Sequence, residues 1–478
     1  MNMRKQLVRF VCSYSLLLLM GGCSEEVMNK IDTDPNNPTD VYISLLIPSV
    51  TVGVPFNVSS TDLAWYSSTF VEQTAGVNAG MWDADRRENL NSQLSENAWA
   101  NIYSDILIDL KLIIDKGSEG GSEEGNWHNV GVAQVLFAYT MFVMTDLFGR
   151  VPYSEALQGS DIRKPKFDTQ EFIYQEMLSM LDSAIVNFQK EATTGIAGGD
   201  FIFGGDVDMW VKLAYSLKAR HLNRLSNMPD STTNHQEALA ALANGFSDGE
   251  GFIFDKYSTS QNNQNPWFRQ EKERGYLAVS STLYNLMNSL NDPRIPLWFT
   301  KVQGDYNAAQ NGTAIKDPSG LFYSRISTNV QYNVAPLAIL TYDELKFIEA
   351  ECHLRKSTPD PVAALAAYTA GVDAALIRAG VSSSAINSYK SQESVIPADP
   401  DDLTLDHIIK QKYIALWPYG SIEAFSEWRR TGIPAMTNPL GNTPRRFPYP
   451  QSELSSNAEN VPDVTIYNGV WWDDGTED

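Results

Sequence analysis

The sequence predicts a mainly α-helical protein, and three observations support this prediction. Apolar residues recur at i, i+3, i+4 and i+7 through most of the chain, which is the period of an amphipathic helix. Several of these runs follow Ser, Thr or Asp, the residues that cap helix starts. Runs with the length and composition of strands are limited to 251–255 and 296–300.

The apolar stripes mark individual helices along the chain. One stripe runs through residues 94–114, and a second runs through 173–188, where Asp168 and Glu171 stand at the spacing of a capping box. Residues 130–145 are the strongest apolar run, and their length suits a buried core helix better than a membrane span. Further helices are expected over 210–222, 341–352, 361–380 and 405–416.

The N-terminus has the three parts of a lipoprotein signal peptide. Residues 1–10 carry three basic residues and no acidic one, residues 11–20 are almost wholly apolar, and two glycines precede Cys23. The apolar run is shorter than the roughly 18 residues that cross a bilayer as a helix. We therefore predict that residues 1–22 are a signal peptide and that the thiol of Cys23 is acylated. Ordinary secretion with a chance cysteine at this position is the alternative.

The chain after the lipidated cysteine divides into two parts. Residues 24–40 are polar, acidic and rich in Pro and Asn, so residues 23–40 are predicted to be a lipidated flexible tether. Residues 41–478 contain no fixed-period repeat and no low-complexity linker. We expect them to form a single domain.

The charge and the cysteines restrict the function further. Lys and Arg number 36 and Asp and Glu 58; three bases leave with the signal peptide, so 33 bases face 58 acids and the mature net charge is −25. Such a chain is repelled by nucleic acid and by anionic membrane surfaces. No apolar run after the signal peptide is expected to span a bilayer, so the predicted membrane attachment is the lipid alone. Cys12 leaves with the signal peptide, and Cys352 falls on an apolar helix face, where we expect a buried core thiol and no intramolecular disulfide.

Motifs of known catalytic chemistry are missing from the sequence. It contains no G-x-S-x-G, H-E-x-x-H, phosphate-binding G-x-x-x-x-G-K-[ST] or dinucleotide-binding G-x-G-x-x-G motif. The five histidines do not stand at metal-ligand spacings, so neither a metal nor a cofactor is predicted. Among 58 carboxylates a glycosidase pair remains open, although nothing singles out one pair.

Two long segments between predicted helices, 78–97 and 256–276, combine aromatic, amide and charged residues. An aromatic ring can stack on the C–H face of a sugar or on a peptide side chain, while amides, carboxylates and Arg hydrogen-bond hydroxyls or backbone. The alternative is that these aromatic residues pack the loops onto the core. The candidate ligand-binding residues are Trp82, Asp83, Arg86, Asn89, Trp267, Arg269 and Tyr276.

Several short motifs occur in the order and spacing of one known family. They are the acidic residues after Cys23, Asp-Pro-Asn-Asn-Pro at 34–38, Asp-Leu-Phe-Gly-Arg-Val-Pro-Tyr at 146–153, the helix at 210–220, Asp-Pro-Arg at 292–294, and the segments 411–416, 423–432 and 446–450. Over essentially the whole chain, this combination resembles the SusD/RagB family of outer-membrane nutrient-binding lipoproteins.

This resemblance implies a SusD-like fold, with tetratricopeptide-like helical pairs on one side and a loop-rich ligand-binding side. It implies a lipid-anchored protein of the outer membrane that faces the cell exterior. The implied partner is a SusC-like TonB-dependent outer-membrane transporter, over which the lipoprotein acts as a lid. The implied ligand is an oligosaccharide or, less often, a peptide.

Three functional hypotheses follow. The leading one is a non-enzymatic receptor that captures a glycan or peptide and delivers it to the transporter. The second is a surface-anchored glycoside hydrolase that uses an unidentified Asp/Glu pair. The third is a structural lid without ligand affinity of its own.

The lipidation hypothesis gives a direct prediction for Cys23→Ala. Because the lipid is the only predicted membrane attachment, the variant should be folded and soluble and should still bind ligand. Fractionation of cells into membrane and soluble material measures this; a variant that stays with the membrane would contradict the prediction.

Overall fold

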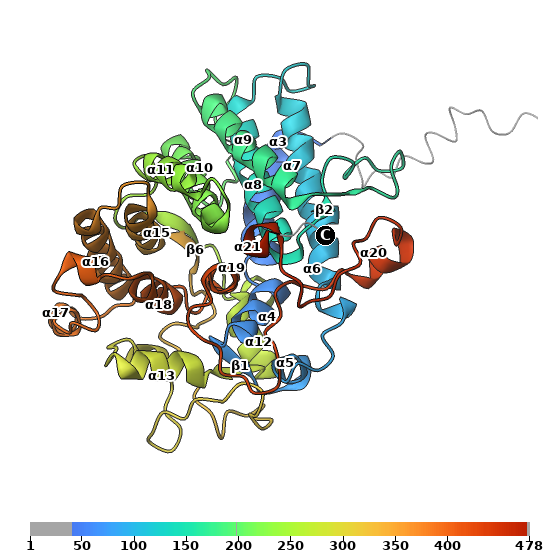
Figure 1. The fold of residues 1–478 in the computed structure, drawn as a ribbon. Coiled ribbons are helices and arrows are strands. Elements are labelled where there is room, and N and C mark those ends of the chain that lie inside the picture. Colours follow the sequence, from blue (N-terminus) through green and yellow to red (C-terminus); the bar gives the residue numbers. More distant parts are fainter. Residues whose placement is uncertain (1–40, 197, 476–478) are drawn as a thin grey trace, which may run out of the picture.

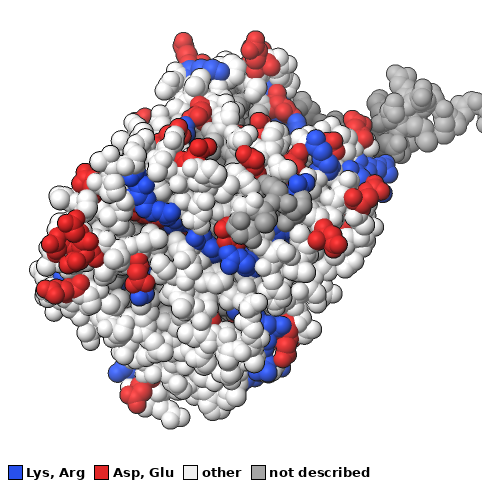
Figure 2. All heavy atoms as spheres, in the orientation of Figure 1, with Lys and Arg blue, Asp and Glu red and all other residues white. Residues whose placement is uncertain are grey.

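The computed structural model describes residues 41–196 and 198–475, so the predicted signal peptide, Cys23 and the whole predicted tether lie outside the described residues. The described chain is mainly α-helical, with short two-stranded sheets, which confirms the predicted fold class. On the face drawn in Figure 2, Lys and Arg form only short bands among acidic and uncharged residues. Asp and Glu lie in separate groups on this face, the largest of them at the left edge of the view.

Four helices from the N-terminal part of the chain pack against one another at the top of Figure 1. They are α3 (Ile43–Gly53), α7 (Ile108–Gly117), α8 (Trp127–Phe148) and α9 (Gln170–Phe188). Two helical stretches of the described chain, Ile43–Phe70 and Trp127–Phe148, are long and apolar enough to cross a bilayer. In the second stretch 94% of the apolar window is buried by protein, which confirms the predicted core helix.

The apolar stripe at 94–114 forms a helix with a change of winding. It comprises α6 (Glu96–Asn101), a π-helical segment η3 (Ile102–Leu107) and α7. Leu110 and Ile113 remain buried after the π segment, so the stripe continues on the core side. The predicted helix is therefore confirmed, and the wider turns of η3 are a feature that its periodicity did not reveal.

Consecutive helices pack as pairs, as the family resemblance implies. These pairs include α8 with α9, α10 (Val207–Arg224) with α11 (Ser231–Leu242), and α15 (Tyr342–Arg355) with α16 (Pro361–Arg378). Further helices follow at α17 (Ser383–Lys390), α18 (Leu405–Ala415) and α19 (Ser421–Thr431). Cys352 on α15 is fully buried, as predicted, and burial holds the pKa of its thiol well above the usual value.

Three antiparallel two-stranded sheets tie distant segments together. They pair β1 (Thr74–Gly76) with β5 (Leu277–Val279), β2 (Val151–Pro152) with β3 (Phe167–Asp168), and β4 (Gly251–Phe254) with β6 (Leu337–Thr341). The strand expected at 251–255 is confirmed. The strand expected at 296–300 is wrong, because Pro296 stands in the first turn of a short helix, α14 (Ile295–Trp298), where its fixed φ fits well.

Short helices and helical turns lie outside the helices predicted from the apolar stripes. They are α4 (Asp62–Phe70), α5 (Ala79–Asp85), α12 (Pro266–Arg274), α13 (Ser281–Ser289), α20 (Gln451–Ser456), α21 (Trp471–Asp474), the π-helical turn η1 (Val54–Val58), and the 3₁₀ turns η2 (Ser92–Leu94), η4 (Leu225–Asn227), η5 (Gln261–Asn263) and η6 (Pro400–Asp402). Between them, residues 303–334 form a long connection without a helix or named strand. The loop-rich side is thus a set of short elements fixed to the helical body.

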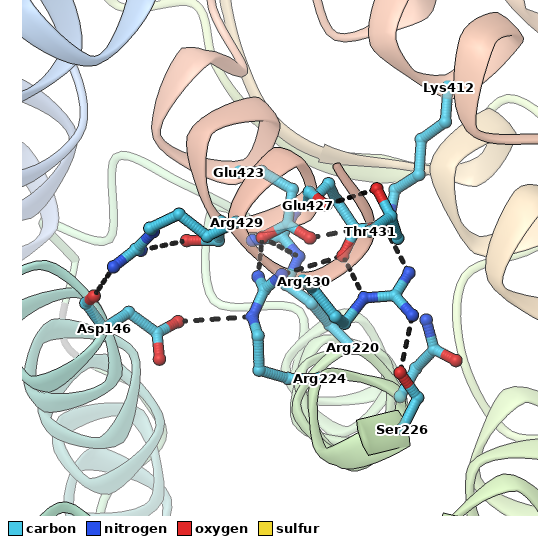
Figure 3. Close-up of polar contacts among 12 residues, drawn as sticks. Asp146, Arg220, Arg224, Ser226, Lys412, Glu423, Glu427, Arg429, Arg430 and Thr431 are labelled. Atoms are coloured by element: carbon cyan, nitrogen blue, oxygen red, sulfur yellow. Dashed lines mark hydrogen bonds and ion pairs between the residues drawn. The ribbon is translucent and has the colours of Figure 1, made fainter. Parts of the chain in front are cut away.

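A buried network of acidic and basic side chains joins the helices at the centre of the fold (Figure 3). Arg224 of α10 lies 2.7 Å from Glu427 of α19 and 3.5 Å from Asp146 of α8, and it also pairs with Glu423 of α19. These side chains are at most 8% exposed. Burial alone would raise the pKa of Glu423, but Arg224 and two further cations outweigh it and hold the pKa at about 2. The carboxylate is therefore kept ionised by its partners.

The network continues along α19 toward α15. Arg430 pairs with Glu427 one turn earlier, at 2.7 Å, and with Glu351 of α15, at 2.6 Å. Arg429 instead donates to the main-chain carbonyl of Arg445, at 3.0 Å. Arg430 therefore pairs with carboxylates, whereas Arg429 donates hydrogen bonds to the main-chain carbonyl oxygens of Asp146 and Arg445.

Removal of one charge from this network should destabilise the fold. We expect Glu427→Gln to lower the free energy of unfolding by about 3–5 kcal/mol, because it removes a buried counter-charge that Arg224 and Arg430 share. Glu349→Gln is the matched control: Glu349 pairs with Lys346 at a partly exposed position, and its loss should cost about 0.5 kcal/mol or less. Urea unfolding measures both, and equal effects would contradict a stabilising role for the network.

Candidate functional site

A pocket of about 410 Å³ opens between α4 and α12. A volume of this size suits a small ligand, for which pockets are roughly 300–1,000 Å³. Helix α4 and the turn before it contribute Phe56, Thr61, Asp62, Trp65 and Tyr66; α12 contributes Pro266, Arg269, Gln270, Glu273 and Arg274; Met81, Gln93, Leu94, Asn97 and Tyr276 complete the lining. The pocket thus combines aromatic rings, amides and both signs of charge.

Local sequence signals place α12 along one wall. The Asn265 side chain accepts hydrogen bonds from the main-chain N–H groups of Trp267 and Phe268, and Pro266 fits the first turn. The helix ends at Gly275, whose φ is 55°. A Cβ at this glycine would stand 2.3 Å from the carbonyl oxygen of Pro318, so both the conformation and the close approach require glycine.

Two side chains in the pocket lining have buried polar atoms without hydrogen-bond partners in the described part of the chain. Gln270 is 3% exposed, and neither its Oε1 nor its Nε2 is bonded. The Nε1 of Trp65 is also buried and unbonded. Leaving such groups unpaired costs on the order of 1–3 kcal/mol each. A ligand with hydroxyl or amide groups could satisfy both, because such groups donate and accept.

The tyrosines of the pocket differ in their surroundings. Burial raises the pKa of Tyr66 to about 12, and Asp62 contributes to the shift, so its hydroxyl stays protonated and able to donate. The hydroxyl of Tyr276 accepts a hydrogen bond from Arg274 at 2.7 Å. The two rings are half-buried and lie in the lining of one pocket.

The charged groups of the pocket are balanced in number. Arg269 pairs with Glu273 at 3.2 Å, and its hydrogen bond lowers the pKa of that carboxyl. Burial raises the pKa of Asp62, while Arg274 and a hydrogen bond from Asn97 act in the opposite direction. Two acidic and two basic side chains therefore line the pocket, with no excess of either sign.

Two of the residues selected from the sequence, Arg269 and Tyr276, line this pocket. A third, Trp267, is on the inner face of α12: it is 0% exposed and packs edge-on against Tyr419 at a centroid distance of 6.0 Å. The expectation that Trp267 contacts ligand is therefore wrong for this structure, because its ring is enclosed by the core.

Trp82 lies next to the pocket and is fixed to the long 303–334 connection. Its Nε1 donates to the carbonyl oxygen of Ala314 at 2.8 Å. The guanidinium of Arg86 lies 4.7 Å from the ring centre, and the ammonium of Lys316 lies 4.5 Å from it. These cations cover part of the ring, so its present contacts are structural.

The other candidate residues of segment 78–97 stabilise its conformation through their own contacts. Arg86 donates to the carbonyl oxygen of Gly312 at 3.0 Å and pairs with Glu88 at 3.3 Å. Asn89 donates to Asp83 at 3.3 Å. The structure thus brings Trp82, Asp83, Arg86 and Asn89 together beside the pocket, and their contact with ligand stays a prediction.

Sequence reasoning missed Trp65, Tyr66 and Gln270. One signal was available for the first two: neighbouring aromatic residues on a helix point in different directions, so both cannot face the core. Gln270 had no such signal, because its lack of partners depends on residues that pack around it from elsewhere in the chain.

A buried carboxylate, Asp85 at the end of α5, joins this helix to two loops. It accepts hydrogen bonds from Asn311 Nδ2, at 2.6 Å, and from the Gly312 N–H, at 2.7 Å. Its own carbonyl oxygen accepts from Asn438 Nδ2, at 2.7 Å. Burial raises the pKa of this carboxyl to about 7 from its ordinary 3.8, although the hydrogen bonds from Gly312 and Asn311 act against the shift.

The helical body and the pocket on its loop-rich side define a ligand-binding protein with paired helices. A family model described as "Starch-binding associating with outer membrane" matches residues 35–450. The chain belongs to this SusD-like family. Comparison with curated protein sequences gave no match.

Solved structures of the same fold support this assignment. A SusD/RagB family protein from Bacteroides thetaiotaomicron is 28% identical, with a TM-score of 0.82 over 91% of this chain and 100% of that one. A SusD homolog from Bacteroides uniformis is 24% identical, with a TM-score of 0.74 over 91% of this chain and 100% of that one. A chitin-binding SusD homolog from Flavobacterium johnsoniae is 23% identical, with a TM-score of 0.75 over 90% of this chain and 99% of that one.

Asp85 should make the folded protein less stable as the pH rises, which is the opposite of the usual effect of a carboxyl group. Between about pH 4 and 7 the folded state holds a proton on Asp85 that the unfolded chain has lost, so the free energy of unfolding falls as the pH rises. We expect Asp85→Asn to reduce the stability difference between pH 5 and pH 8 by about 2 kcal/mol. Urea unfolding at the two pH values measures this, and parallel pH profiles for the two proteins would contradict the prediction.

Proposed function

We propose that this protein is a bacterial surface lipoprotein that binds an uncharged oligosaccharide in the pocket between α4 and α12. The observation that carries the proposal is the unpaired amide of Gln270, buried in a pocket with half-buried aromatic rings. The family description and the name of the Flavobacterium johnsoniae relative refer to starch and chitin, which supports a glycan over a peptide.

The lining offers each type of contact that a sugar needs. The rings of Trp65, Tyr66 and Tyr276 can face the apolar C–H surface of a sugar ring. Gln270 and the Nε1 of Trp65 can exchange hydrogen bonds with its hydroxyl groups. We propose Arg269 as a further donor at the pocket wall.

The charge balance of the pocket favours a neutral ligand. Asp62 and Glu273 offset Arg269 and Arg274, and Glu273 is already paired with Arg269. An acidic sugar would have to displace this pair, whereas a neutral sugar can add hydrogen bonds to it. Starch and chitin are both uncharged polymers.

The anchoring and the partner are also part of the proposal. The family is described as associating with the outer membrane. The sequence around Cys23 supports lipid anchoring at that membrane, facing the cell exterior. We propose that the bound glycan is delivered to a SusC-like TonB-dependent transporter, which accords with the lack of a known catalytic motif in the sequence.

The alternative hydrolase would need an acid and a carboxylate on either side of the scissile bond. Asp62 and Glu273 are the acidic residues in the pocket lining, so they are the pair to test. Incubation with oligosaccharides followed by chromatography decides between the functions. Intact ligand supports a receptor, and shorter products that disappear in Asp62→Asn would establish the hydrolase.

Gln270→Leu should make the protein more stable and its binding of oligosaccharide weaker. Because the amide is buried without partners, an apolar side chain of similar size should raise the free energy of unfolding by about 1 kcal/mol. The same change should weaken oligosaccharide binding about tenfold, since it removes the proposed hydrogen bonds to ligand. Urea unfolding and titration calorimetry with malto- and chito-oligosaccharides measure the two effects.

Gln411→Leu is the matched control. Gln411 is equally buried, but its Nε2 donates to Tyr389 at 2.8 Å. This variant should lose stability and keep its affinity for oligosaccharide. If Gln270→Leu binds oligosaccharide as tightly as the unchanged protein, the Gln270 amide is not a ligand contact, and the proposed site is wrong.

A further inference from the structure

A second hollow, of about 650 Å³, lies on the other side of η2 from the proposed glycan pocket. Ser92 lines this second hollow, while the next residue, Gln93, lines the pocket. Adjacent Cα atoms are about 3.8 Å apart, so only the width of one chain segment separates the two spaces. The opposite wall is formed by residues 446–467, which include α20.

The segment between the two hollows is held from several directions. Asn91 Oδ1 accepts from the Gln93 N–H at 3.0 Å, and Ser92 Oγ donates to Gln451 at 3.1 Å. Ser95 Oγ donates to the carbonyl oxygen of Pro448 at 2.6 Å. In Figure 1 the helices on either side, α6 and α20, lie close together, as these contacts require. Residues 91–95 therefore form a ridge between the pocket and the second hollow, held in place by these hydrogen bonds.

The side chains around the second hollow resemble those of the pocket in chemical type. Tyr467 is 43% exposed and Leu454 is 44% exposed, and both face the same space. Asn91, Asp463 and Thr465 add amide, carboxylate and hydroxyl groups. An exposed aromatic ring beside polar groups is the combination that binds a sugar.

A buried cation in the same lining gives an independent indication of a ligand. None of the three guanidinium nitrogens of Arg87 has a hydrogen-bond partner among the described residues, although all three are buried. The guanidinium lies 5.7 Å from the ring centre of Phe70. Arginine has five N–H donors, and leaving them unpaired in a buried position is costly unless an acceptor arrives from outside.

We propose that the second hollow is an additional subsite for the same glycan, so that a long oligosaccharide crosses η2 and occupies both spaces. This inference rests on the proposed glycan-binding function. A short oligosaccharide occupies the first pocket alone. A longer one adds contacts with Tyr467 and brings hydroxyl acceptors toward Arg87.

The test measures affinity against ligand length, with malto- and chito-oligosaccharides from the disaccharide to the octasaccharide as probes. For the unchanged protein, affinity should rise about tenfold beyond the tetrasaccharide, as the second subsite fills. Tyr467→Ala should remove this increase while the affinity for disaccharide and trisaccharide stays the same. Trp65→Ala should weaken binding at every length.

Tyr332→Ala is the matched control, because Tyr332 is 39% exposed and lines neither hollow. It should show the full increase with length. Binding that does not change with length, or an increase that survives in Tyr467→Ala, would overturn the second subsite and leave the proposed function intact. Failure of every probe to bind would overturn both.

Discussion

The buried ion pairs around Arg224 are the constraint on which the rest of the structure depends. The buried charge of Arg224 is balanced by acidic partners, and these come from α8 and α19. Asp146, Glu423 and Glu427 thereby fix helices that are far apart in the sequence. The helical body becomes a rigid support, and the short elements of the loop-rich side are attached to it.

The segments of the loop-rich side are held in place by a different kind of interaction. They are joined by hydrogen bonds from side chains to main chain, such as those around Asp85 and at the start of α12. These bonds hold loops without filling the space between them with apolar side chains. A pocket can therefore persist beside a dense core, with Gln270 and Trp65 left unpaired.

The sequence predicts the long helices well, because stripes such as those of α8 and α9 extend over several turns. Helix α12 was too short for its period to stand out, and so Trp267 was expected at the ligand although it faces the core. The pocket itself could not be predicted, since its walls come from segments about 200 residues apart. The pairing of Arg224 with Glu427 could not be predicted for the same reason, because about 200 residues separate them. The pairing of Arg430 with Glu427 could, because these two residues stand one helical turn apart.

The ridge at η2 has a consequence for the shape of the ligand. Because Ser92 and Ser95 are bonded to the opposite wall, the protein does not need to bend when a chain lies across it. The curvature has to come from the glycan, and its cost depends on the flexibility of the glycosidic linkage. A polymer that coils spontaneously would cross at less cost than a stiff ribbon, so the gain in affinity with length would be larger for a glycan with natural curvature.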